Sequence, residues 1–145
     1  MNEHFYSVDL LWKKERKGSL SSPELQQEIE VATPPQFPGG MEGIWSPEHL
    51  FTAAVNSCLM TTFLAIAENS KLNYQSFECS AKGKLEKVEN KFLMTEVILY
   101  PKVKIQDEND RDKASRVLEK SERNCLISNS IKSKVTLIPE ISVMN

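Results

Sequence analysis

The sequence has no excess of positive charge, few cysteines and no internal repeat. Its 145 residues carry a formal net charge of −2, and the isoelectric point is near 5.8. This charge argues against a nucleic-acid-binding protein, because such proteins show a basic excess or patch. Three cysteines are too few for the disulfide framework of a small secreted protein and favour free thiols. The missing repeat excludes collagen, coiled-coil and repeat architectures.

The sequence also lacks a clear membrane span and a secretion signal. Its most apolar stretch, residues 50–67, is interrupted by threonine, asparagine and serine, and it falls short of the ~20 largely apolar residues that a span needs. The N-terminus does not have the basic, apolar and small-residue order of a signal peptide. We therefore expect a cytoplasmic protein that does not enter the membrane.

The hydrophobic pattern predicts one α+β domain over residues 1–145. A chain of this length matches the usual size of ~100–150 residues for one domain. Alternating apolar residues predict strands, and a 3.6-residue period predicts a helix. The predicted order is β-β-α-β-β-α-β, with strands at 4–12, 25–31, 74–87, 91–105 and 134–143, a charged turn at 13–22, a loop at 33–45 and a polar helix at 107–123.

The central helix is predicted to begin at Ser46, which can cap it, with Pro47 and Glu48 in its first turn. Its polar residues spread around the whole helical wheel, which is typical of a helix buried on every side. In a small domain such burial requires a sheet on one face and a second helix or a second subunit on the other. The pattern is therefore a first indication of a dimer.

The cysteines are the candidate chemical groups. Cys58 lies in the middle of the central helix, where a core thiol is the ordinary interpretation. Cys125 opens a segment rich in asparagine and serine, where we expect a more exposed thiol. Cys79 lies within a strand and is interpreted as a core residue. The cysteines show no Cys-x-x-Cys spacing, and the two histidines show no His-x-x-x-His spacing. We therefore predict neither a metal site nor another cofactor site.

Two stretches resemble the signatures of the OsmC/Ohr family, the osmotically inducible and organic-hydroperoxide-resistance thiol peroxidases. The stretch SPEHLFTAAVNSCLMTTFLAIAENSKL (46–72) resembles the first, with ten positions between Glu48 and Cys58. The stretch ERNCLISNSIKSKVTL (122–137) resembles the second, although Leu126 stands where many relatives have proline. The resemblance covers essentially the whole chain and implies a two-layer fold with a buried central helix and an intertwined homodimer.

The resemblance also implies a mechanism. Cys58 would attack an organic hydroperoxide, or hydrogen peroxide, and become a sulfenic acid, which Cys125 would convert to a disulfide. An external thiol, either a lipoylated protein, thioredoxin or a small thiol, would then reduce the pair. Because burial raises the pKa of a thiol, we expect a nearby cation to be required. The family implies an arginine from the first hairpin held by the motif glutamate, here Arg16 and Glu48.

Helix geometry adds an expectation about assembly. Ten residues separate Glu48 from Cys58, which corresponds to about 15 Å along a straight helix. We therefore expect Glu48 and Arg16 to serve the Cys58 of a second subunit in a two-fold homodimer.

Apolar residues near the two motifs predict a preference for alkyl or fatty-acyl hydroperoxides; these are Trp45, Phe51, Leu59, Met60 and Phe63. The alternative function is a non-catalytic OsmC-like protein that binds a small apolar ligand or a partner.

Overall fold

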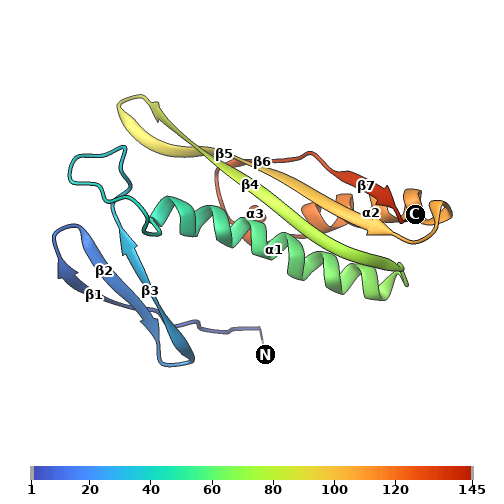
Figure 1. Ribbon diagram of the computed structural model, residues 1–145, viewed down its shortest axis with the longest axis horizontal. Coiled ribbons are helices and arrows are strands. Elements are labelled where there is room, and N and C mark those ends of the chain that lie inside the picture. Colours follow the sequence, from blue (N-terminus) through green and yellow to red (C-terminus); the bar gives the residue numbers. More distant parts are fainter. Residues whose placement is uncertain (1, 145) are drawn as a thin grey trace. The chain divides into compact units, whose positions relative to one another are not determined.

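A computed structural model describes residues 2–144 of the chain (Figure 1). The chain divides into two compact units, with the border between Leu50 and Phe51. The N-terminal unit contains three strands and the first residues of helix α1. The C-terminal unit contains the rest of α1, four strands and the remaining helices. Strands and helices are mixed as predicted, so the α+β class is confirmed.

The N-terminal unit is an antiparallel meander of β1 (Asp9–Lys14), β2 (Lys17–Ser22) and β3 (Leu25–Ala32), with β2 in the middle. The prediction that residues 13–22 form one long turn is wrong. Only Glu15 and Arg16 form the turn between β1 and β2, and Glu15 has a positive φ of 53°. The segment Lys-Gly-Ser-Leu-Ser-Ser has little apolar alternation, and pairing with a neighbour on each side makes it a strand.

The loop over residues 33–45 and the helix start match the prediction. The loop ends at Trp45, whose carbonyl accepts a hydrogen bond of 2.8 Å from the Ala32 N–H. Helix α1 spans Pro47–Asn69, and the buried Ser46 precedes it. The Ser46 hydroxyl accepts a 3.2 Å hydrogen bond from the His49 N–H, which satisfies one of the unpaired donors of the first turn.

The C-terminal unit has a four-stranded sheet. β4 (Tyr74–Val88) and β5 (Lys91–Ile105) form a long antiparallel hairpin. Glu89 and Asn90 connect them, both with positive φ, as a two-residue hairpin turn requires. β6 (Lys134–Leu137) and β7 (Glu140–Val143) both pair with β5 in parallel.

The last strand, predicted as one piece over 134–143, is divided in two. Residues 138 and 139 separate β6 from β7. Pro139 has no N–H to donate to a neighbouring strand, which is the physical reason for the interruption.

One face of α1 packs on β5 and forms the core. Towards its C-terminal end, Phe63 and Ala67 contact the C-terminal half of β5 and the helix α2 (Arg111–Arg123). Nearer its start, Val55 and Leu59 contact the middle of β5. Helix α1 and strand β4 approach each other closely at Gly83, because a Cβ on this residue would lie 2.2 Å from the Thr52 hydroxyl oxygen.

The prediction that α1 is buried on every side is wrong for the single chain. Met60 and Leu64 are 41% and 39% exposed. The expectation that this stretch is too short for a membrane span also fails, since α1 is long and apolar enough by length and composition alone. In this structure its buried apolar side chains form the core instead.

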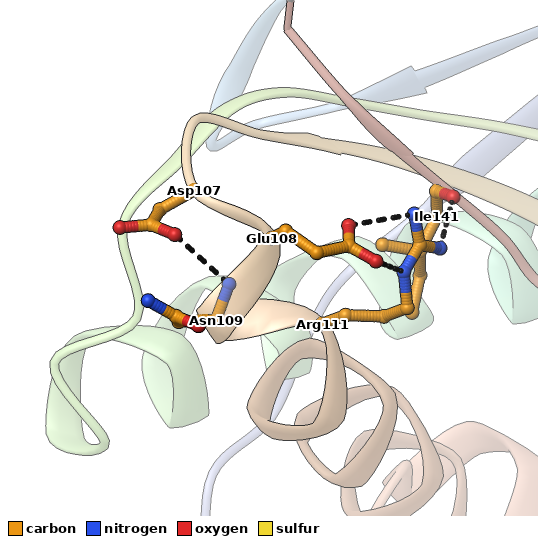
Figure 2. Close-up of polar contacts among 5 residues, drawn as sticks. All are labelled: Asp107, Glu108, Asn109, Arg111 and Ile141. Atoms are coloured by element: carbon orange, nitrogen blue, oxygen red, sulfur yellow. Dashed lines mark hydrogen bonds and ion pairs between the residues drawn. The ribbon is translucent and has the colours of Figure 1, made fainter.

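A polar cluster fixes the start of α2 (Figure 2). Asp107 caps a short 3-10 helix, Glu108–Asp110, by accepting a 2.9 Å hydrogen bond from the Asn109 N–H. The Arg111 guanidinium holds the Glu108 carboxylate through two hydrogen bonds and donates a third to the Ile141 carbonyl of β7. The cluster therefore ties the N-terminal end of α2 to the sheet. The predicted apolar face of α2, Ala114, Val117 and Leu118, is buried.

Candidate functional site

The structure brings Cys58 and Cys125 together within the C-terminal unit. Cys58 lies midway along α1, and Cys125 is the N-cap residue of the short helix α3 (Leu126–Asn129). The two thiols share a hydrogen bond. Both are free thiols, 8% and 1% exposed respectively. The expectation that Cys125 is exposed is therefore wrong, because its side chain is buried beside Cys58 in spite of the polar residues that follow it.

The pKa of Cys58 is lowered. Burial raises it, but hydrogen bonds to the sulfur outweigh burial: the largest comes from the Cys125 thiol, followed by the backbone N–H of Ile127, the Thr62 hydroxyl and the backbone N–H of Leu126. The two N–H groups belong to the first turn of α3, where a helix has no internal partners for them. The Thr62 oxygen lies 4.0 Å from the sulfur. The arrangement favours a thiolate at Cys58.

In the single chain the pKa of Cys58 is lowered without a cation, so a cation from a second subunit stays a prediction. All the groups that lower it are hydrogen-bond donors of the C-terminal unit. Sequence reasoning missed Thr62 and the two N–H groups. Thr62 is one helical turn after Cys58, so its spacing could have identified it. The N–H groups had no such signal, because they depend on how α3 packs against α1.

The pKa of Cys125 is raised. Burial is the main cause, and the hydrogen bond with Cys58 adds to it, whereas the Ser128 hydroxyl and N–H act in the opposite direction. Opposite shifts in a contacting pair assign different roles to its members. Cys58 is the sulfur that ionises first, and Cys125 remains a thiol that donates its hydrogen to Cys58.

Cys79 is a core residue and does not belong to this pair. It packs against the core formed by Val55, Leu59 and the middle of β5, as predicted. Burial raises its pKa to about 11. Since the thiolate is the reactive form of a cysteine, Cys79 is unreactive at neutral pH.

The two other predicted site residues lie in the N-terminal unit. Arg16 is exposed in the turn between β1 and β2, and Glu48 is half-buried in the first turn of α1. Arg16 and Pro47, which precedes Glu48, both border a groove of about 320 Å³ on this unit. Gly39 makes room for the arginine, because a Cβ there would lie 2.7 Å from its Nε.

Some of the apolar residues predicted to contact substrate have a different role. Leu59 and Phe63 are fully buried core residues, and Phe51 packs against the core. Only Met60 and Trp45 of the predicted set are exposed, by 41% and 53%. The period of α1 did not distinguish them, because its apolar residues occur on all sides of the helix.

Comparisons with known proteins identify the family of the chain. Residues 40–140 match the model of the family described as OsmC-like protein. Bacillus subtilis YmaD, an uncharacterized protein, is 26% identical over 148 residues, which cover 99% of this chain and 97% of YmaD.

Two solved structures show the same fold. The first is the OsmC-like protein of unknown function VCA0330 from Vibrio cholerae, with a TM-score of 0.84 and 24% identity over 94% of this chain and 99% of that chain. The second is an organic hydroperoxide resistance protein from Elizabethkingia anophelis, with a TM-score of 0.76 and 22% identity over 98% and 99% of the two chains. With the family model matching well over half of its residues, the chain belongs to the OsmC-like protein family.

Proposed function

We propose that the protein is a cysteine-based peroxidase that reduces organic hydroperoxides in the cytoplasm, as part of the defence against oxidative stress. The observation that carries the proposal is the Cys58–Cys125 pair, with one pKa lowered and the other raised. The chain belongs to the OsmC-like protein family, and organic hydroperoxide resistance proteins are among its structural relatives. This relationship supports organic hydroperoxides as the substrate class.

In the first step the Cys58 thiolate attacks the terminal oxygen of the hydroperoxide. An S–O bond forms, the O–O bond breaks and an alkoxide leaves, which takes up a proton to become an alcohol. Cys58 is then a sulfenic acid, oxidised by two electrons. Cys125 is a suitable source of the proton, since its thiol already donates to the Cys58 sulfur.

In the second step the Cys125 thiolate attacks the sulfenic sulfur. The S–O bond breaks, hydroxide leaves and takes up a proton from the solvent to become water, and a Cys58–Cys125 disulfide forms. An external dithiol then supplies two electrons and two protons to restore both thiols. The complete reaction converts one hydroperoxide and one dithiol to one alcohol, one water and one disulfide.

The test counts thiols before and after addition of one equivalent of cumene hydroperoxide. We expect two thiols to be lost for each chain, and a peptide map to show Cys58 joined to Cys125 with Cys79 still free. Unchanged thiols would contradict the peroxidase and support a non-catalytic protein that binds an apolar ligand.

The second part of the proposal is a two-fold homodimer with shared sites. One face of the β1–β3 sheet is apolar, because residues that pair across neighbouring strands share a face. The side chains that form this face are Leu10, Trp12, Leu20, Ile29 and Val31. Leu10 and Trp12 are 67% and 71% exposed in the single chain. A second subunit would cover this face and the exposed side of α1, and it would bring Arg16 and Glu48 of one chain to the cysteine pair of the other.

Complementation tests the shared site. Mixed dimers of Cys58→Ser and Arg16→Ala chains should regain one competent site for each heterodimer. The measurement is peroxide reduction before and after the two inactive or weakened variants are unfolded and refolded together. No recovery, or a monomer in sedimentation at micromolar concentration, would contradict this assembly.

A further inference from the structure

One surface of the C-terminal unit has no role in the steps above. Residues from the end of α1 and from one side of α2 border an open groove of about 440 Å³. Ile66 and Val117 give it apolar surface, and Ser70 lies at its α1 side. The groove lies entirely within the C-terminal unit, so its form does not depend on the other unit.

The groove is strongly basic. Four cations of α2 border it, at intervals of three, four and three residues that place them along one side of the helix: Lys113, Arg116, Lys120 and Arg123. Glu119 is the one acidic residue among those that border it. None of the four basic side chains forms an ion pair with another residue of the range 2–144. Their charge is therefore available to a partner, on a chain whose formal net charge is −2.

Both sides of the groove lead to the cysteine pair. On the α1 side, Ile66 continues the row of every fourth residue that begins with Cys58 and Thr62. Ser70, the residue after the helix, extends this row, because its N–H donates a 2.9 Å hydrogen bond to the Ile66 carbonyl. Neighbours in this row are one helical turn apart, so Ile66 is about 12 Å along the axis from Cys58.

The α2 side reaches Cys125. Its basic row ends at Arg123, two residues before Cys125. The Arg123 carbonyl accepts a 3.1 Å hydrogen bond from the side chain of Asn129, the last residue of α3. The end of the basic row is thus attached to the helix whose first N–H groups contact Cys58.

We propose that this basic groove is the docking surface for an acidic protein that carries a dithiol and reduces the Cys58–Cys125 disulfide. The inference rests on the peroxidase function proposed above and identifies the class of its reductant. One thiolate of the partner bonds to one sulfur of the disulfide, the Cys58–Cys125 bond breaks, and the other cysteine leaves as a thiolate. The second thiol of the partner then displaces the first cysteine, so the partner is oxidised to a disulfide and both cysteines are reduced.

The test compares two reductants in steady-state reduction of cumene hydroperoxide. The first is a dihydrolipoylated domain of net negative charge, and the second is dithiothreitol, which is small and uncharged. The groove variant is Arg116→Glu with Lys120→Glu, both at exposed positions. The matched control is Lys102→Glu with Lys104→Glu, which makes the same change in net charge at exposed positions of β5.

We expect kcat/KM for the acidic domain to fall by at least about tenfold in the groove variant, mainly through KM, because the charges that attract the partner are reversed. The rate with dithiothreitol should stay the same, and the control variant should behave like the unmodified protein with both reductants. Polyglutamate should inhibit reduction by the acidic domain and leave the dithiothreitol rate unchanged.

Four outcomes would overturn the docking surface while leaving the peroxidase intact. The first is an equal rate of the groove and control variants with the acidic domain, and the second is a loss of rate in the groove variant that is the same with both reductants. The third is that the unmodified protein does not turn over with the acidic domain, and the fourth is inhibition by duplex DNA but not by polyglutamate. Failure of the proposed function itself is different, because the unmodified protein would then reduce no peroxide even with dithiothreitol.

Discussion

The two units of the chain differ in how completely each forms a folded structure by itself. The C-terminal unit buries large side chains such as Phe63, Leu59 and Leu118 between a helix layer and a sheet. In the β1–β3 sheet the buried residues are the small Gly18 and Ala32. The comparison shows that the Cys58–Cys125 pair lies in the unit with its own core, whereas the unit that carries Arg16 has an apolar face that is exposed in the single chain.

Loss of the attacking sulfur has the largest expected effect. Cys58→Ser should lower peroxide reduction by at least about a thousandfold, since a serine hydroxyl is not ionised at neutral pH. Cys125→Ser should keep a single turnover and then stall at the sulfenic acid, which excess peroxide oxidises further. Single-turnover kinetics and mass spectrometry measure both effects.

Cys79→Ser is the matched control for these two variants, and its peroxidase rate should remain unchanged because the Cys79 thiol stays protonated at neutral pH. If Cys125→Ser also lost the first turnover, the assignment of attacking and resolving roles would be wrong.

Arg16→Ala tests whether the N-terminal unit contributes to ionisation or to substrate positioning. Because hydrogen bonds of the C-terminal unit already lower the pKa of Cys58, we expect a loss of about 100-fold that is equal at all pH values. The measurement is the second-order rate with cumene hydroperoxide against pH. A loss confined to low pH would instead show that Arg16 lowers the Cys58 pKa.

The exposed apolar face of the β1–β3 sheet should respond to a charge. Trp12→Glu should weaken the dimer by about 30-fold, the effect of about 2 kcal/mol at a central interface residue. Sedimentation equilibrium measures the change. Gln26→Glu adds a charge on the opposite face of the sheet and should leave the dimer intact. Equal behaviour of the two variants would mean that this face is not the interface.

The smallest expected effect comes from one hydroxyl. Thr62→Val removes a donor to the Cys58 sulfur and should raise the pKa of Cys58. The thiolate forms as pH rises through this pKa, so the rate should fall a few-fold below it and be unchanged well above it. Thr61→Val is the control, because the Thr61 hydroxyl donates to the Cys58 carbonyl. The absorbance of the thiolate against pH measures the shift.

The local patterns of the chain predicted much of the fold. The Ser46 cap, the start of α1 at Pro47 and the β4–β5 hairpin all depend on residues close together in the sequence, and the structure has them where they were expected. β2 was missed for the opposite reason. Its segment has little apolar alternation, and it is a strand because β1 and β3 both pair with it.

The sequence by itself predicted that Cys58 and Cys125 form a pair, because each lies in a motif of neighbouring residues, and the structure brings the two thiols together. Only the tertiary structure decided what lowers the Cys58 pKa. The N–H groups of Leu126 and Ile127 are nearly 70 residues away along the chain, and no side-chain pattern describes where a backbone N–H points. A sulfur's ionisation depends on the donors around it in space, and that set is complete only when α3 packs against α1.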